Sequence, residues 1–220
     1  GDIVITDAFN VTFSSTVDAD NFTQIDGQGT TLFSGTIDLA ADFTFTGNNL
    51  TINGAANTID GDFDANLNTA AGVLTFGNSA TTTVGGVLTQ DIIGAVANTG
   101  VVIGANLETT GNGSEIDFES AVTLTGDADE IITLTTNGAA DSDIILQSTL
   151  GNTANESITF NAGALGDVTV TGAVGDLGNG DIVITDAFDV TFSSTVDADN
   201  FTQTDGQGTT LFSDTIDLAS

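Results

Sequence analysis

The chain has 220 residues, of which 31 are Asp or Glu and none is Lys, Arg or His, so its formal net charge is −31. Without Lys or Arg, no charged side chain can hold phosphates, and we expect no nucleic acid as a partner and no binding to anionic membrane surfaces. Without His, Cys or Lys, the chain lacks an ordinary general base near neutral pH, a thiol nucleophile and a Schiff-base amine, so we expect no enzyme.

Such a charge would favour disorder, but hydrophobic residues make up 40% of the chain, as in a folded domain, and they are regularly spaced. No run approaches the roughly 18 apolar residues of a membrane helix, and no signal peptide is visible. We therefore expect a folded chain without membrane insertion. The lack of Cys fits a large bacterial surface protein without disulfides.

Residues 1–41 return at the end of the chain as residues 180–220, a 179-residue offset. The two stretches differ at four positions only. The four differences are Asn10/Asp189, Ile25/Thr204, Gly35/Asp214 and Ala41/Ser220. We predict that residues 1–179 form one complete repeat and that residues 180–220 begin the next, as a window of a longer tandem array. The changes avoid the alternating apolar positions, so we expect the same core in both copies.

Short strands alternate with turns along the chain. Near the N-terminus, Phe9, Val11 and Phe13 alternate with Asn10 and Thr12, which places the apolar side chains on one side of a strand. The same period of two recurs at residues 43–45, 50–52, 116–118 and 168–170. Pairs such as Asn-Gly and Asp-Gly separate these segments and are typical of turns. No stretch has a helical pattern, so the sequence predicts an all-β fold.

A shorter repeat lies within the long one. TFSSTV begins at Thr12 and LFSGTI at Leu32, while TVTGAV, TFSSTV and LFSDTI begin at Thr169, Thr191 and Leu211. This spacing of about 20 residues is typical of one coil of a parallel β-solenoid, with Phe stacked in interior ladders. About nine coils would fill the 179-residue unit and extend it by about 43 Å at about 4.8 Å per coil. The alternative is a β-sandwich, which usually has Trp or Tyr in its core.

Strings such as GDIVITDAFNVTFSSTVDADN and NLTINGAANTIDG resemble the large repetitive exoproteins of bacteria. These are the filamentous-haemagglutinin-like and autotransporter-type β-strand-repeat proteins, and the resemblance extends over nearly the whole chain. It implies a right-handed parallel β-helix, export to the cell surface, and work as an adhesin, fibre or matrix protein. The family has no catalytic residues to carry over.

Two kinds of acidic segment could supply the oxygen ligands that Ca²⁺ prefers. One places three Asp at alternate positions from residue 60, on one face if the segment is a single strand. The other is a turn that begins at residue 18 and returns in the second copy. The candidate ligands are Asp18, Asp20, Asp26, Asp60, Asp62, Asp64, Asp197, Asp199 and Asp205. The EF-hand pattern fails, because Ala65 and Ala71 occupy its Gly and Glu positions. A solvated outer face is the plain alternative.

Stacking adds a second argument for external cations. Coils about 4.8 Å apart bring carboxylates together, and at that distance two of them repel by about 1 kcal/mol even in water. The chain has no cationic side chain to offset this repulsion. We therefore expect divalent cations or salt to stabilise the fold, although no cofactor is required.

These features together predict an extracellular or cell-surface structural protein, built as a fibre, an adhesin stalk or a matrix element. Its expected partners are further copies of itself, packed end-on or laterally, and cell-surface glycans. The alternative function is a Ca²⁺- or glycan-binding surface module. Ice binding by Thr-rich positions such as residues 81–83 is a weaker alternative, because a regular Thr-x-Thr in every coil is missing.

Overall fold

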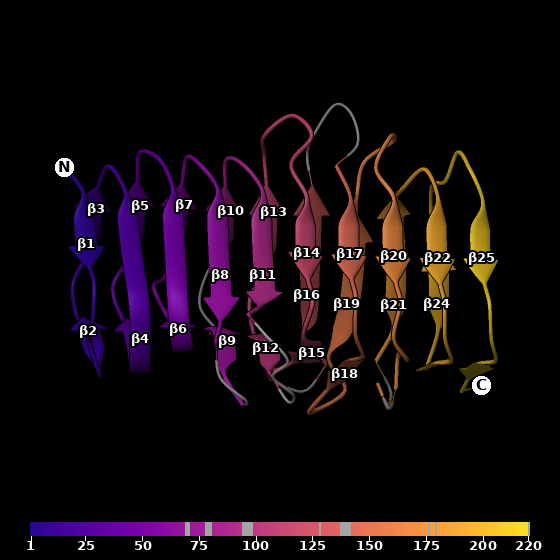
Figure 1. Cartoon of the computed structure of the whole chain (residues 1–220). Coiled ribbons are helices and arrows are strands. Elements are labelled where there is room, and N and C mark those ends of the chain that lie inside the picture. Colours follow the sequence, from indigo (N-terminus) through magenta and orange to yellow (C-terminus); the bar gives the residue numbers. More distant parts are fainter. Residues whose placement is uncertain are drawn as a thin grey trace.

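The computed structural model describes residues 1–68, 71–77, 81–93, 99–127, 129–136, 142–175, 177–178 and 180–219. These residues form 26 strands and no helix. Among them, therefore, no helix is long and apolar enough to cross a membrane. Of the four positions that differ between the copies, Ser220 lies outside the described residues. The strands wind around one axis as a row of coils (Figure 1), and the chain is an all-β β-solenoid.

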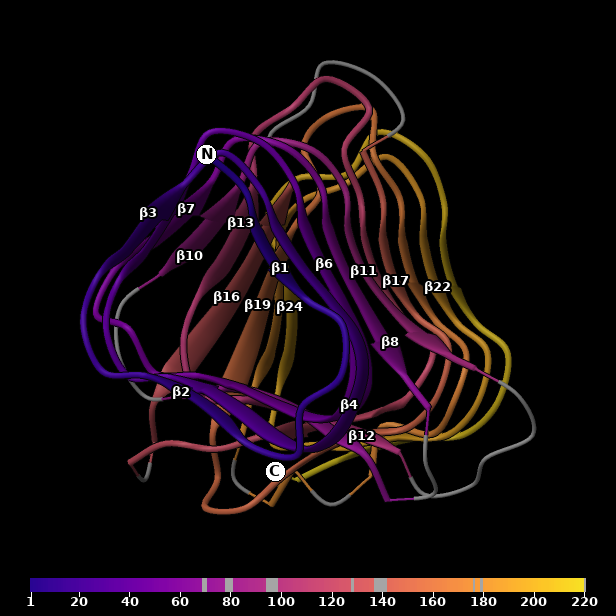
Figure 2. The same cartoon turned by 60° about the vertical axis from the view of Figure 1, so that its left-hand side comes forward.

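Each coil contributes to three faces of the rod, and Figure 2 shows this three-sided outline. The first face holds β1 (Ile3–Ile5), the first halves of β4 (Phe22–Phe33) and β6 (Phe43–Ile52), β8 (Phe63–Leu67), β11 (Leu88–Ile92), β14 (Ile116–Phe118), β17 (Ile144–Leu146), β20 (Val168–Val170), β22 (Val190–Phe192) and β25 (Thr210–Phe212). Long strands β4 and β6 bend at the corner, so their second halves belong to the next face.

The second face continues from these second halves. It holds β2 (Val11–Phe13), β9 (Val73–Phe76), β12 (Gly100–Ile103), β15 (Ala121–Leu124), β18 (Leu150–Asn152), β23 (Val196–Ala198) and β26 (Ile216–Leu218). Single bridges through Val174 link β18 to β23. The third face holds β3 (Val17–Ala19), β5 (Ile37–Leu39), β7 (Asn57–Ile59), β10 (Thr82–Val84), β13 (Leu107–Thr109), β16 (Ile131–Thr136), β19 (Ser157–Asn161), β21 (Ile182–Asp186) and β24 (Phe201–Gln203).

Every strand pair in the described part of the chain is parallel. Each coil therefore binds the coils before and after it through backbone hydrogen bonds, as in a solenoid. The antiparallel β-sandwich considered as the alternative is excluded.

Coil length varies along the rod. Near both ends it matches the expected length of about 20 residues, since Phe43 pairs with Phe63 and Val190 with Thr210. In the middle it is larger, because Leu88 pairs with Ile116, a 28-residue step along the chain. Part of this increase lies between β13 and β14, which residues 110–115 separate, whereas only residues 60–62 separate β7 from β8. From β1 to the counterpart of β1 in the second copy, the chain passes seven complete coils and two further faces. The expected nine coils per 179-residue unit are therefore too many.

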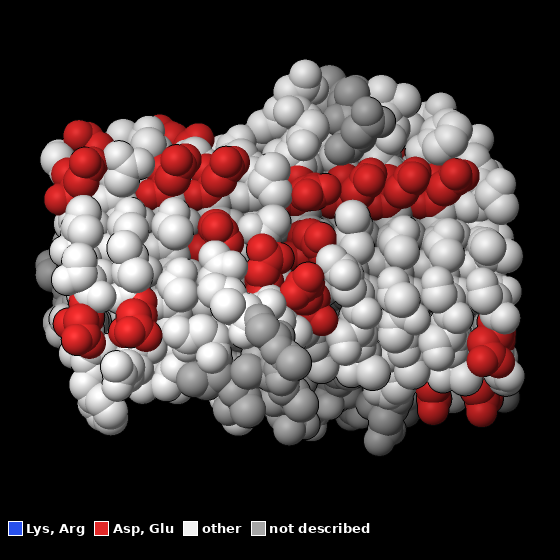
Figure 3. Space-filling view, viewed as in Figure 1, with Lys and Arg blue, Asp and Glu red and all other residues white. Residues whose placement is uncertain are grey.

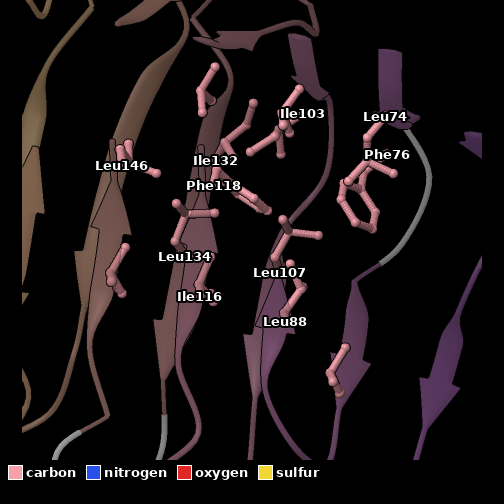
Figure 4. Close-up of a cluster of buried hydrophobic side chains, with 14 of the residues drawn as sticks. Leu74, Phe76, Leu88, Ile103, Leu107, Ile116, Phe118, Ile132, Leu134 and Leu146 are labelled. Carbon is pink, nitrogen blue, oxygen red and sulfur yellow. The ribbon is translucent and has the colours of Figure 1, made fainter. Parts of the chain in front are cut away.

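The core follows the alternation that the sequence predicts, with every second strand residue buried. The rings of Phe22, Phe43 and Phe63 stack at centroid distances of 4.8 and 4.7 Å, so the predicted Phe ladder is confirmed. Between Phe76 and Phe192 the core consists mainly of Leu, Ile and Val, with Phe118 and Phe160 among them, and Figure 4 shows part of it around Leu107 and Leu134.

One residue of the predicted alternation does not reach the core. Phe9 is 72% exposed, although it was expected to point the same way as Val11 and Phe13. The strand begins only at Val11, and the residues before it form the corner between β1 and β2. A period of two fixes side-chain direction only inside a strand, which explains the error.

Candidate functional site

The acidic residues of the first copy lie apart on its surface. Asp18 points outward from β3, beside Asp38 of β5, while Asp20 follows β3 at the next corner. Asp26 lies in the middle of β4 with a φ of 57°. Among the described residues, no three Asp or Glu form a group that could hold a metal ion. The three candidate ligands are thus not brought together in one site.

The candidates of the second copy have the same distribution. Asp197 points outward from β23 beside Asp217 of β26, and Asp199 follows β23. Asp205 accepts a hydrogen bond of 2.9 Å from the N–H of Gly206 through its Oδ1. Each of these carboxylates is an individual surface group.

The segment from residue 60 is not a single strand face. Asp60 follows β7 on the third face, and Asp62 precedes β8, so only Asp64 lies within a strand. The chain turns at Gly61, where an added Cβ would lie 2.1 Å from Oδ1 of Asp42. The expectation of one shared face is therefore wrong for Asp60. Within β8, Asn66 donates a hydrogen bond of 2.9 Å to Asp64.

A ladder of Asp and Asn side chains runs along the corner before the first face, and we call it the corner ladder. Its members each directly precede a strand of that face. They are Asn21, Asp42, Asp62, Asp143, Asp167 and Asp189. In each case Oδ1 accepts a hydrogen bond from the backbone N–H at the same position of the next coil, at 2.6–3.1 Å. Figure 3 shows acidic side chains in rows along the rod.

The corner ladder gives Asp62 a structural role that sequence reasoning missed. Its Oδ1 accepts a hydrogen bond of 2.9 Å from the N–H of Val87, so the side chain holds two coils together. A signal was present in the sequence, because Asp-Phe-Thr, Asp-Phe-Asp, Asp-Ile-Ile and Asp-Val-Thr all begin strands at coil spacing. Carboxylates that accept backbone N–H groups stabilise the chain without any metal.

A second acidic group lies on the middle of the first face, and we call it the central acidic cluster. Its members are Asp64, Asp91, Glu115, Asp117 and Glu119. Burial raises the pKa of Asp91, and the nearby carboxylates of Glu119, Asp64 and Asp117 raise it further. Burial also raises the pKa of Glu115, with Asp117 and Asp143 adding to the effect. The folded state therefore favours uptake of a proton by the cluster.

Hydrogen bonds hold the central acidic cluster in place. Nε2 of Gln147 donates to both carboxylate oxygens of Asp117, at 2.8 and 3.0 Å. Burial still raises the pKa of Asp117 above its ordinary value, although this amide opposes the shift. Glu119 accepts a hydrogen bond of 2.8 Å from the N–H of Ile92. Sequence reasoning missed Asp91, because the 28-residue register that brings it close to these carboxylates has no counterpart in the local pattern.

Glu156 is a fully buried carboxylate outside these surface groups. It accepts hydrogen bonds from the N–H of Ala154 at 2.7 Å and from both the N–H and the hydroxyl of Thr153 at 3.1 Å. Burial alone would raise the pKa of Glu156, but these donors outweigh it and hold the pKa below its ordinary value. Glu156 therefore stabilises the turn between β18 and β19 as an anion. No sequence pattern predicted it.

The remaining outer surface is mainly threonine. On the first face, outward positions in successive coils include Thr23, Thr44 and Thr89, and later Thr169 and Thr191. Asp64, Asp117 and Ile145 interrupt this row. No pocket is found in the described part of the chain. The surface therefore offers rows of hydroxyl and carboxylate groups along the rod.

No protein-family model matches the chain, and no curated protein or solved structure is similar enough to count as a match. The resemblance to filamentous-haemagglutinin-like and autotransporter-type exoproteins therefore stays a prediction. What the chain does has to be argued from its own geometry.

Proposed function

We propose that this chain is a segment of an extracellular structural rod, which works as a fibre, an adhesin stalk or a matrix element. One observation carries the proposal. Residues 1–41 and 180–219 form coils of the same kind at the two ends of one continuous core. Each further copy of the repeat would then lengthen the rod, because a coil stacks on its neighbours without any change in fold.

The chemistry of the surface supports this role. It consists largely of Thr, Asn and Asp side chains, and the formal net charge of −31 keeps the rod soluble and repels other rods at low salt. A rod of this kind acts through its length and its outer faces, with further copies of itself or cell-surface glycans as partners. The proposed function is non-enzymatic, since the sequence has no Lys, His or Cys to act as a base or nucleophile.

The proposal is tested by joining one, two or three copies of the 179-residue unit in one chain and measuring the particle length by small-angle X-ray scattering. Seven coils and two faces correspond to about 37 Å at about 4.8 Å per coil. We expect each added unit to increase the length by this amount at a constant cross-section. A compact particle whose cross-section grows with each unit would refute the proposal.

A second candidate is a cation-binding surface module, in which a cation would relieve the burial and mutual repulsion of the carboxylates around Asp91, although no three described carboxylates form a group that could hold a metal ion. Thermal unfolding is measured in EDTA, in millimolar Ca²⁺, and in NaCl of matched ionic strength. A larger rise in Tm with Ca²⁺ than with NaCl supports specific binding, since a ligand of the folded state stabilises it by mass action. Equal rises mean that salt only screens the charges. The variant Asp91→Asn should reduce a specific Ca²⁺ effect, whereas Asp18→Asn should not.

A further inference from the structure

The two copies of the repeated stretch lie on different faces of the rod. In the first copy, β1, β2 and β3 belong to the first, second and third faces. Their counterparts are the start of β21, β22 and β23, which belong to the third, first and second faces. Figure 2 shows β24, the counterpart of the start of β4, on the third face with β19, and β21 pairs with both strands between them. Every counterpart is displaced by one face in the same direction.

One side-chain contact of the repeated stretch is kept in spite of this displacement. In the first copy, the hydroxyl of Thr31 donates a hydrogen bond of 2.8 Å to Oε1 of Gln24. The counterparts Thr210 and Gln203 form the same hydrogen bond at 2.6 Å. The backbone around this contact differs, because β4 runs continuously from Phe22 to Phe33 with a φ of 57° at Asp26, whereas its counterpart is divided into β24 and β25. The repeated stretch thus keeps this side-chain contact on either face.

The displacement follows from the length of the repeat. Seven complete coils and two further faces separate β1 from its counterpart, which makes 23 faces, and 23 is not a multiple of three. If all coils had the length found at the ends, the number of faces between β1 and its counterpart would differ from 23. The longer coils in the middle, such as the one from Leu88 to Ile116, therefore determine where the second copy begins.

One of the changes between the copies matches the new position. Asn10 lies at the corner before the second face, where its Oδ1 accepts the N–H of Thr30 at 2.9 Å. Its counterpart Asp189 lies at the corner before the first face and accepts the N–H of Thr209 at 2.6 Å. There the carboxylate extends the corner ladder that comes from Asp167, whose Oδ1 is 3.0 Å from the N of Asp189.

We infer that, in an array of this repeat, each successive repeat presents the same surface one face further around the rod. The inference rests on the proposed function, because it requires repeats that stack as one rod. A surface such as the central acidic cluster then lies on the first face in one repeat, on the third face in the next repeat and on the second face in the one after. It returns to its original face after three repeats.

This arrangement determines how a partner meets the rod. Equivalent surfaces lie about a third of a turn apart and about 37 Å apart along the axis. A second rod that binds one surface therefore leaves the equivalent surfaces of the next repeats open in two other directions. Lateral association of such arrays builds three-dimensional bundles, whereas repeats aligned on one face would build flat sheets.

The placement is tested in the 220-residue chain by disulfide formation, because the chain has no Cys of its own. Thr169 and Thr191 are register partners on the outer side of β20 and β22. Adjacent parallel strands are about 4.8 Å apart, within the Cα separation that a disulfide spans. We expect the double variant Thr169→Cys/Thr191→Cys to oxidise to an intramolecular disulfide. The matched pair Thr23→Cys/Thr44→Cys, from neighbouring coils near the N-terminus, measures the efficiency of the reaction.

The competing arrangement, with both copies on the same faces, predicts another pair. Val183 is the counterpart of Val4 on the first face, and without displacement it would lie beside Thr169. The variant Thr169→Cys/Val183→Cys should therefore stay reduced when the control pair is oxidised. A disulfide in this variant, or none between residues 169 and 191 when the control forms, would overturn the inference.

The array itself is tested with three joined units that carry Thr23→Cys in each, labelled with gold and imaged by electron microscopy. We expect successive labels on three different sides of the rod, and labels in one straight line would contradict the inference. The two proposals fail differently. If particles do not lengthen with added units, the rod function fails, while the disulfide between residues 169 and 191 still reports the placement of the second copy.

Discussion

The two copies of the repeated stretch have nearly the same sequence but differ in burial. In the first copy, Ile37 and Leu39 are fully buried, whereas their counterparts Ile216 and Leu218 are 41% and 42% exposed. The first pair is covered by the next coil, through β7, while the second pair contacts only the coil before it. Sequence decides which side chains point inward, and the neighbouring coil decides how far they are removed from water. Comparison of the two copies thus separates the effect of the sequence pattern on side-chain direction from the effect of a neighbouring coil on side-chain burial.

The largest expected effect is a difference between counterparts. Phe33 is fully buried and stacks on Phe13 at 4.7 Å, whereas its counterpart Phe212 is only partly buried. We expect Phe33→Ala to cost about 3–5 kcal/mol of unfolding free energy, the usual range for a buried Phe. Phe212→Ala should cost clearly less unfolding free energy, because folding removes less of the apolar surface of Phe212 from contact with water. Denaturant titration of both variants measures this, and equal losses would contradict the role given to stacking.

The next effect concerns the turn between β18 and β19, which precedes the second copy. We expect Glu156→Gln to lower the unfolding free energy by about 1–3 kcal/mol, because at least one buried donor on Thr153 or Ala154 loses its acceptor. The pKa of Glu156 lies below its ordinary value of 4.5, so its contribution is present above that value and is lost as the pH falls through the lowered pKa. Thermal unfolding at pH 7 and at lower pH measures the loss. The control Glu108→Gln, on the outer side of β13, should change little.

A smaller effect is expected at Asp189, the one position where the second copy has a carboxylate in place of an amide of the first copy, Asn10. Asp189→Ala removes the acceptor of the Thr209 N–H and should cost about 1 kcal/mol. Asp189→Asn restores the residue of the first copy and keeps Oδ1, so we expect unchanged or slightly higher stability. The difference between the two variants is measured by denaturant titration at low and high salt. An equal loss in both variants would show that the charge, and not the hydrogen bond, matters at this position.

The smallest expected effect is on the pH dependence of stability, and it concerns Asp91 in the middle of the rod, outside both copies of the repeated stretch. The raised pKa of Asp91 means that the folded state binds this proton more tightly than the unfolded state does. The stability should therefore rise as the pH falls from 7 through the raised pKa, and the gain should be complete below the ordinary value of 3.8. Asp91→Asn should flatten this part of the pH profile, measured by thermal unfolding. A profile unchanged by Asp91→Asn would contradict the assignment.

Much of the fold could be predicted from the sequence, because a period of two and a spacing of about 20 residues follow directly from strand and coil geometry. The alternation in DFTFTG and the Phe at equal spacing indicated the buried side of β6 and the Phe ladder correctly. The exposed corner at Phe9 was missed, since no local pattern tells where a strand begins.

The candidate sites were harder to predict, because they depend on residues that are far apart in the chain. Asp91 and Asp117 come together only because β11 pairs with β14 in a 28-residue register. The 20-residue spacing that is visible in the sequence near both ends does not predict this register. The displacement of the second copy by one face depends on the same coil lengths. The hydrogen-bonded role of Asp62 could have been predicted, since an Asp directly precedes several strands of the first face. Its carboxylate was interpreted as a metal ligand instead.

The central claim is that one core of stacked coils runs without interruption from each copy of the repeat into the next. Cryo-electron microscopy of a protein with three joined 179-residue units tests it most directly. We predict a straight rod in which parallel strands about 4.8 Å apart continue through both junctions between units. Separate globular bodies joined by linkers, or a break in the strand spacing at each junction, would contradict the claim.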